Sequence, residues 1–278
     1  MTSDDRVSAL LRPDAVGAAI LPGLDTRGTP GVEDRETAEA EMPELADRLD
    51  DLQERLWVEE TRSLLVVLQG MDTSGKGGTV RHVFSAMNPA GIEVTSFKKP
   101  TEEELAHHFL WRIERKLPVP GEVMVFDRSH YEDVLVVRVR SLVPEDVWRS
   151  RYDEINAFEE RVAAAGTTIV KCMLHISYEE QRERLLARLD DPDKHWKFNE
   201  GDIEERRHWL DYQSAYEEAI RQCSTDVAPW YVIPADRKWY RNWAISKLLI
   251  ETLERMDPEL PRPDLDVEAL RERLRPPN

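Results

Sequence analysis

A glycine-rich loop that follows an apolar run constrains this chain more than any other feature. Residues 64–79 read LLVVLQGMDTSGKGGT, an apolar run that ends in a loop rich in small residues. Small residues let backbone N–H groups converge on phosphate oxygens, and a lysine adds a positive charge. The pattern predicts a phosphate-binding loop between a buried strand and the start of a helix. The residues expected to contact phosphate are Gly70, Ser74, Gly75, Lys76, Gly77, Gly78 and Thr79.

Position 77 departs from the common form of such loops. Gly77 follows the lysine where a Ser or Thr usually gives its hydroxyl to magnesium, and a carboxylate, Asp72, lies inside the loop. A second carboxylate, Asp127, ends the apolar run 123–126. Ligands gather at the carboxyl ends of parallel strands, so we expect Asp127 to lie beside the loop. Mg²⁺ prefers carboxylates, phosphate oxygens and water, and Asp72 and Asp127 are therefore the predicted metal ligands.

Arg128 follows the strand-end carboxylate directly. Its planar fork matches phosphate geometry, and we expect it to stabilise charge on a phosphoryl group in transfer. The alternative is a solvated Asp–Arg pair at the end of a strand.

Short apolar segments alternate with helical patterns along the chain, which predicts an α/β fold with a parallel sheet covered on both faces. We expect one domain at 36–256, an irregular N-terminal arm at 1–35 and a C-terminal tail at 257–278. The arm is expected to lie across the domain or across a neighbouring subunit. The expected strands are 64–69, 93–97, 122–126, 167–176 and 230–233. The expected helices are 36–60, 76–88, 102–116, 131–140, 144–165, 178–190, 203–222, 237–256 and 266–274.

The segment from about 178 to 209 is typical of a helical lid. Arg184 and Arg188 are four residues apart, on one face of the expected helix, and Lys194 and Lys197 follow. Residues 177–209 also hold ten acidic residues against seven Lys or Arg, so a salt-bridged surface helix is the alternative. Lys98 follows the second strand, and we expect it to lie near the crevice of the phosphate loop. A solvated position for Lys98 is an equal alternative.

The formal charge of −17 argues against broad binding to nucleic acid or to an anionic membrane. An anionic ligand would need a narrow basic tunnel in an acidic shell. Two cysteines, Cys172 and Cys223, are too few for a disulfide framework and indicate core thiols in a reducing compartment. The acidic N-terminus is unlike a signal peptide, and no apolar run reaches the ~18 residues of a spanning helix. We therefore expect a cytoplasmic protein.

Four segments of the chain carry a family pattern: GMDTSGKGG at 70–78, FDRSHYEDV at 126–134, DPDKHWKF at 191–198 and APWYVIPADRKWYRNWA at 228–244. Together they resemble the second family of polyphosphate kinases, the polyphosphate:nucleotide phosphotransferases. The resemblance covers about 60 to 255. It implies a three-layer α/β/α fold like that of the P-loop kinases and thymidylate kinases, with a helical lid. It also implies a homodimer or homotetramer.

The resemblance implies a role for several residues. Asp72 and Asp127 would bind Mg²⁺, or Mn²⁺ in its place, Lys76 would bind phosphate, and Arg128 would be catalytic. Arg184 and Arg188 match the lid arginines and would bind the phosphate ligand, as would Lys197, and Arg188 would also be catalytic. The implied substrates are inorganic polyphosphate and adenine or other purine nucleotides. The string HYEDVLVVRV looks like the forms that accept AMP, including those that continue from ADP to ATP.

Two other functions stay open at this point. One is an ATP-dependent nucleotide or small-molecule kinase, which would use the same loop with a different donor. The other is a P-loop protein that senses nucleotide or polyphosphate without catalysis, although the presence of both carboxylates argues against it.

Overall fold

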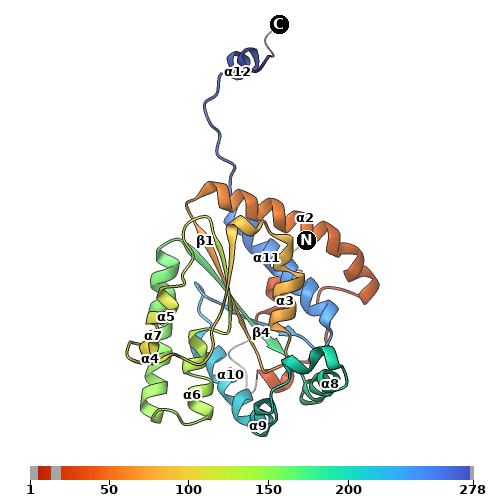
Figure 1. Ribbon diagram of the computed structural model, residues 1–278, viewed down its shortest axis with the longest axis vertical. Coiled ribbons are helices and arrows are strands. Elements are labelled where there is room, and N and C mark those ends of the chain that lie inside the picture. The colour runs from red at the N-terminus through yellow and green to blue at the C-terminus, as the bar shows by residue number, and fades with distance from the viewer. Residues whose placement is uncertain (1–5, 14–19, 276–278) are drawn as a thin grey trace.

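A computed structural model of the chain describes residues 6–13 and 20–275 (Figure 1). The expected arm and tail are therefore described only in part, because 1–5, 14–19 and 276–278 lie outside the described residues. In the described part of the chain five strands form one sheet, and each expected strand is confirmed to within one residue at either end. The strands are β1 (Ser63–Gln69), β2 (Ile92–Ser96), β3 (Val123–Asp127), β4 (Thr167–His175) and β5 (Trp230–Pro234).

All the strand pairs are parallel, in the order β2-β3-β1-β4-β5. The central strand β1 is buried along its whole length, whereas the edge strand β2 is largely exposed. After β1 the chain crosses to the β2 side of the sheet, and after β3 it crosses to the β4 side. The carboxyl ends of β1 and β3 thus flank the point where the chain changes direction, which is where open α/β sheets bind ligands.

Helices cover both faces of the sheet, as Figure 1 shows. One layer holds α2 (Arg35–Glu59), α3 (Lys76–His82) and α11 (Lys238–Met256), and the other holds α7 (Glu145–Ala164) and α10 (Trp209–Cys223). This confirms the three-layer α/β/α expectation. The helix α12 (Val267–Leu274) is exposed and stands away from the body.

The helix α2 shows how the sequence pattern determines packing. Asp34 caps its start by accepting a hydrogen bond of 2.8 Å from the Thr37 amide. Its leucines at three- and four-residue spacing form a buried stripe, and the helix packs along α11. The stripe consists of Leu45, Leu49, Leu52 and Leu56.

The expectation of long helices at 76–88, 102–116, 131–140 and 203–222 was wrong in each case, because each segment forms two shorter helices. They are α3 with η3 (Phe84–Ala86), α4 (Glu102–Leu105) with α5 (Trp111–Glu114), η5 (His130–Asp133) with α6 (Val136–Val139), and α9 (Gly201–Arg207) with α10.

Tertiary hydrogen bonds anchor η5, the first half of the third segment. The Tyr131 hydroxyl donates to Glu159 Oε1 at 2.9 Å, and His130 Nε2 lies 3.2 Å from the same oxygen. Both side chains are buried, and Lys171 completes the network by donating to Glu159 and Tyr131. These long-range bonds hold η5 against α7 and β4.

The described part of the arm packs on its own domain. The helix α1 (Val7–Leu11) contacts α11 and β5, and the amides of Val7 and Ser8 donate to the carboxylate of Glu251. A short turn, η2 (Leu21–Gly23), buries Leu21.

Candidate active site

The phosphate loop connects β1 to α3, as expected. Gly70 and Gly75 have φ values of 147° and 110°, which a side chain would strain. Lys76 begins α3 and is 8% exposed, and its Nζ donates to the carbonyl of Gly70 at 2.7 Å. Burial lowers the pKa of Lys76, the charge of Arg128 lowers it further, and Asp72 and Asp127 oppose the shift. The lysine therefore folds back over the loop among the predicted catalytic groups.

Three hydroxyls of the loop are buried without a hydrogen-bond partner among the described residues. They belong to Thr73, Ser74 and Thr79. Buried polar groups are usually paired. These orphaned donors fit a loop whose partner is an anionic ligand.

The end of β3 lies beside the loop, as the sequence predicts. Leu68 of β1 is in register with Asp127, and the Arg128 amide donates to the Leu68 carbonyl at 3.0 Å. The Arg128 side chain turns to the loop, where Nη2 donates to Asp72 Oδ1 at 2.8 Å. Burial lowers the pKa of Arg128 most, but the acidic groups of Glu132, Asp72 and Asp127 outweigh it and raise that pKa overall.

The predicted metal ligands Asp72 and Asp127 share this crevice. Among the described residues, no three His, Cys, Asp or Glu side chains gather into a cluster that could hold a metal ion. Mg²⁺ needs no such cluster, since it is commonly held by one or two carboxylates together with substrate phosphates and water. The two carboxylates beside a phosphate loop therefore fit Mg²⁺ or Mn²⁺.

Arg184, which the sequence assigned to ligand binding, is committed to the loop backbone. It belongs to α8 (Tyr178–Leu189), and its guanidinium donates to the carbonyls of Thr73, Ser74, Ala235 and Asp236 at 2.6–3.0 Å. Its Nε donates to Glu180 at 2.7 Å. All five N–H groups are thereby used, so Arg184 ties the loop to the end of β5.

The other predicted lid residues line a cleft of about 860 Å³ beside the loop. Arg188 and Lys197 lie on its lid side, together with Lys194 from η6 (Pro192–Lys197). Among the described residues, the lining holds seven Lys or Arg side chains and four Asp or Glu. In place of the narrow basic tunnel that the sequence predicts, the structure has a cleft with an excess of basic side chains, in a chain of negative net charge. Lys98 lies elsewhere, in a smaller pocket beyond β2 that Arg112 and Trp111 also line.

Sequence reasoning missed three residues of the site. Arg241 and Lys238, in the first turn of α11, line the basic cleft. Glu132 carries a charge that acts on Arg128 and Lys76, and burial raises its pKa. Both basic residues belong to the segment 228–244 that carries the family resemblance. Their position just after the carboxyl end of β5 could have indicated a place at the site.

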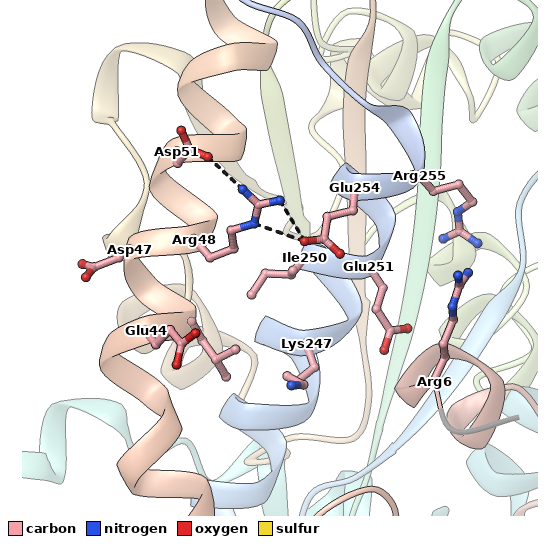
Figure 2. Close-up of a pocket in the computed structure, with 11 residues that line it drawn as sticks. Arg6, Glu44, Asp47, Arg48, Asp51, Lys247, Ile250, Glu251, Glu254 and Arg255 are labelled. Carbon is pink, nitrogen blue, oxygen red and sulfur yellow. Dashed lines mark hydrogen bonds and ion pairs between the residues drawn. The ribbon is translucent and has the colours of Figure 1, made fainter. Parts of the chain in front are cut away.

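A second groove of similar size lies between α2 and α11, away from the phosphate loop (Figure 2). Charges of both signs line it, and Arg48 donates to Asp51 on the same helix and to Glu254 across the groove. None of the predicted site residues lines this groove.

Known proteins are similar to this chain in both sequence and fold. The profile of the family Polyphosphate kinase 2 (PPK2) matches residues 32–261. An AMP/ADP-polyphosphate phosphotransferase of Meiothermus ruber is 55% identical over 223 residues, which cover 80% of this chain and 84% of the relative. An ADP-polyphosphate phosphotransferase of Rhodopseudomonas palustris is 42% identical, covering 85% of this chain and 86% of the relative.

A crystal structure of Polyphosphate Kinase 2 from Arthrobacter aurescens superimposes with a TM-score of 0.94. It is 46% identical, and the match covers 97% of this chain and 96% of that one. The chain belongs to the polyphosphate kinase 2 family.

Proposed function

We propose that this protein is a phosphotransferase that moves the terminal phosphoryl group of inorganic polyphosphate to a nucleoside mono- or diphosphate. The reactions would convert AMP to ADP and ADP to ATP. The names of the Meiothermus and Rhodopseudomonas relatives support this activity. The observation that carries it is the basic cleft, because an excess of Lys and Arg lines it in a chain of charge −17.

The composition of the cleft favours polyphosphate over ATP as the donor. An adenosine group is best accommodated by apolar and aromatic side chains, as most small-molecule sites are. Here the lining beside the phosphate loop is mostly charged, and Trp239 is the one Phe, Tyr or Trp among the described residues that line it. A linear polyanion matches this surface better than a nucleoside.

Charge neutralisation and alignment are the chemistry that the site offers. Lys76 lies over the loop, and Arg128 faces it from the end of β3. These cations would hold the reacting phosphates in line and stabilise the charge of the transition state. A nucleotide phosphate, with a second pKa of about 6, is already anionic near neutrality and needs no general base. We infer direct in-line transfer without a phosphoenzyme.

A divalent metal completes the proposal. Asp72 and Asp127 would hold Mg²⁺, or Mn²⁺ in its place, and the ion would screen the crowded phosphate oxygens and polarise the bond that breaks. Asp72 also accepts a hydrogen bond from Arg128, so its carboxylate would serve both the metal and the arginine.

We further propose that the protein assembles as a homodimer or homotetramer and that 178–209 closes as a lid.

We also propose that the protein acts in the cytoplasm. Both cysteines are buried and unpaired, which suits a reducing compartment. Among the described residues, no helix combines the length and apolar character that crossing a membrane requires.

One assay separates the three candidate functions. Purified protein is incubated with Mg²⁺, with long-chain polyphosphate or ATP as the sole donor, and with AMP or ADP, and the nucleotides are resolved by chromatography. The proposal predicts ADP and ATP from polyphosphate. Turnover with ATP alone would establish an ordinary nucleotide kinase, and binding without turnover would establish a sensor. Lys76→Met is the inactive control, and Lys116→Met, an exposed lysine, is the matched one.

A further inference from the structure

Arg241 is a buried cation without an anionic partner among the described residues. It lies in the first turn of α11 and is 2% exposed. Its hydrogen bonds run from Nε and Nη2 to the neutral side-chain oxygen of Asn242, at 3.2 and 2.8 Å. The other terminal nitrogen, Nη1, has no acceptor among these residues.

The positive charges around Arg241 add electrostatic repulsion to the free-energy cost of burying its guanidinium. Burial and the neighbouring Arg184 lower the pKa of Arg241 to about 10. The pKa of Lys238, one turn earlier, is lowered by burial and by the charges of Arg184, Arg241 and Lys194, with Glu180 opposing. Buried charges in proteins are usually paired or bind ions. A cluster of cations whose members repel one another is therefore suited to an anion supplied by a ligand.

Two glycines of the loop region make room for this arginine. A Cβ built on Gly75 would lie 1.8 Å from Arg241 Nη1, and one built on Gly78 would lie 3.1 Å from Nη2. Gly75 directly precedes α3, and Gly78 lies in its first turn. The guanidinium thus lies against the surface that these glycines leave bare, along the wall of the basic cleft.

The position of Arg241 differs from that of the reacting groups. Asp72, Asp127 and Arg128 lie at the carboxyl ends of β1 and β3 and do not line the basic cleft, whereas Arg241 does. A donor chain held by the loop at one end and continuing along α3 would pass the guanidinium after the phosphate that reacts.

On this basis, and resting on the proposed function, we propose that Arg241 binds a phosphate group of the polyphosphate donor beyond the one that is transferred. The residue would then determine how tightly the donor chain is held and how strongly chain length is favoured. Its fork would donate to phosphate oxygens from Nη1, the nitrogen that no described group engages.

Binding in the absence of nucleotide tests this proposal without any turnover. Isothermal titration with tripolyphosphate and with long-chain polyphosphate would compare the wild type with Arg241→Gln and Arg241→Lys. Losing a charge-assisted contact should weaken binding by about tenfold or more, and lysine should restore part of it. Arg255→Gln is the control, because it removes the same charge from an exposed position at the other end of α11. Wild-type affinity in Arg241→Gln would overturn the proposal.

Kinetics provide a readout that a merely structural residue would not move. In Arg241→Gln, KM for long-chain polyphosphate should rise about tenfold while kcat at saturating donor stays within a small factor of wild type. An unchanged KM, whatever happens to kcat, would contradict the assignment. If the wild type bound polyphosphate through Arg241 but transferred nothing, the proposed function would fail while this inference stood.

Discussion

Arg128, at the end of β3, donates a hydrogen bond of 2.8 Å from Nη2 to Oδ1 of Asp72, inside the phosphate loop. Both ends of this contact rest on unusual backbone, because Arg128 has a φ of 64° and Thr73, next to Asp72, a φ of 66°. Residues other than glycine adopt such angles at a cost and are concentrated at functional sites. The contact joins a predicted catalytic arginine to a predicted metal ligand.

Replacing Asp127 with Asn should lower kcat more than about 100-fold, because several kcal/mol of charge stabilisation would depend on a metal held there. Steady-state assays with polyphosphate and AMP, at several Mg²⁺ concentrations, would measure the effect. Ser96→Ala is the control, since that hydroxyl lies 3.5 Å from Asp127 Oδ2 without being a proposed ligand. Near-wild-type activity in Asp127→Asn would mean that the metal site is elsewhere.

Gly77 and Gly75 should respond to substitution in opposite ways. A Cβ on Gly77 would meet no atom within 4 Å, so Gly77→Ser should fold normally and raise the free energy of unfolding by up to about 0.5 kcal/mol through its better helix propensity. Gly75→Ala should cost about 1–2 kcal/mol from its φ of 110° alone, and it would also displace Arg241. Urea unfolding of both variants measures the difference.

The activity of Gly77→Ser addresses the departure from the common loop. If Asp72 and Asp127 supply the metal contacts, a hydroxyl at position 77 should leave the rate in the same range as wild type. A large rise in activity would show that the loop lacks a ligand which the two carboxylates do not replace.

The two lid arginines should separate into different roles. Arg184→Met removes hydrogen bonds to four backbone carbonyls and should lower the free energy of unfolding by about 2–3 kcal/mol. Arg188→Met, whose side chain is 25% exposed and contacts Asp202 at 3.3 Å, should cost less than about 1 kcal/mol and should mainly raise KM for polyphosphate. Equal losses of stability in urea would refute this division.

Stability in acid should depend on Glu59 at the end of α2. The Arg62 guanidinium lowers the pKa of Glu59 from 4.5 to about 2, against an opposing effect of burial. Because the folded value lies below the unfolded one, this contribution is complete above about pH 4.5 and is lost as the pH falls towards 2. The urea midpoint of Glu59→Gln should therefore fall less between pH 5 and about pH 3 than that of the wild type. Parallel curves for the two proteins would disprove the link.

Much of this architecture could be predicted because it is encoded locally. Apolar runs bounded by glycine or charge predicted all five strands, and the loop pattern placed Lys76 and Asp72 where the structure has them. Long-range partners could not be predicted in this way. The buried contacts of Tyr131 depend on Glu159 and Lys171, which are distant in sequence. The commitment of Arg184 depends on carbonyls at the ends of two strands, and the burial of Arg241 depends on how α11 meets α3.

The central claim is that polyphosphate gives its terminal phosphoryl group directly to a nucleotide. A single-turnover reaction with polyphosphate carrying a ³²P-labelled terminal phosphate, excess enzyme, Mg²⁺ and AMP tests it, with nucleotides and protein separated after rapid quenching. The account predicts that the label appears in ADP as it leaves the chain, and that the protein stays unlabelled throughout. Label that passes through the protein would contradict it. So would label that never reaches nucleotide, if a parallel reaction with ATP as the donor does phosphorylate AMP.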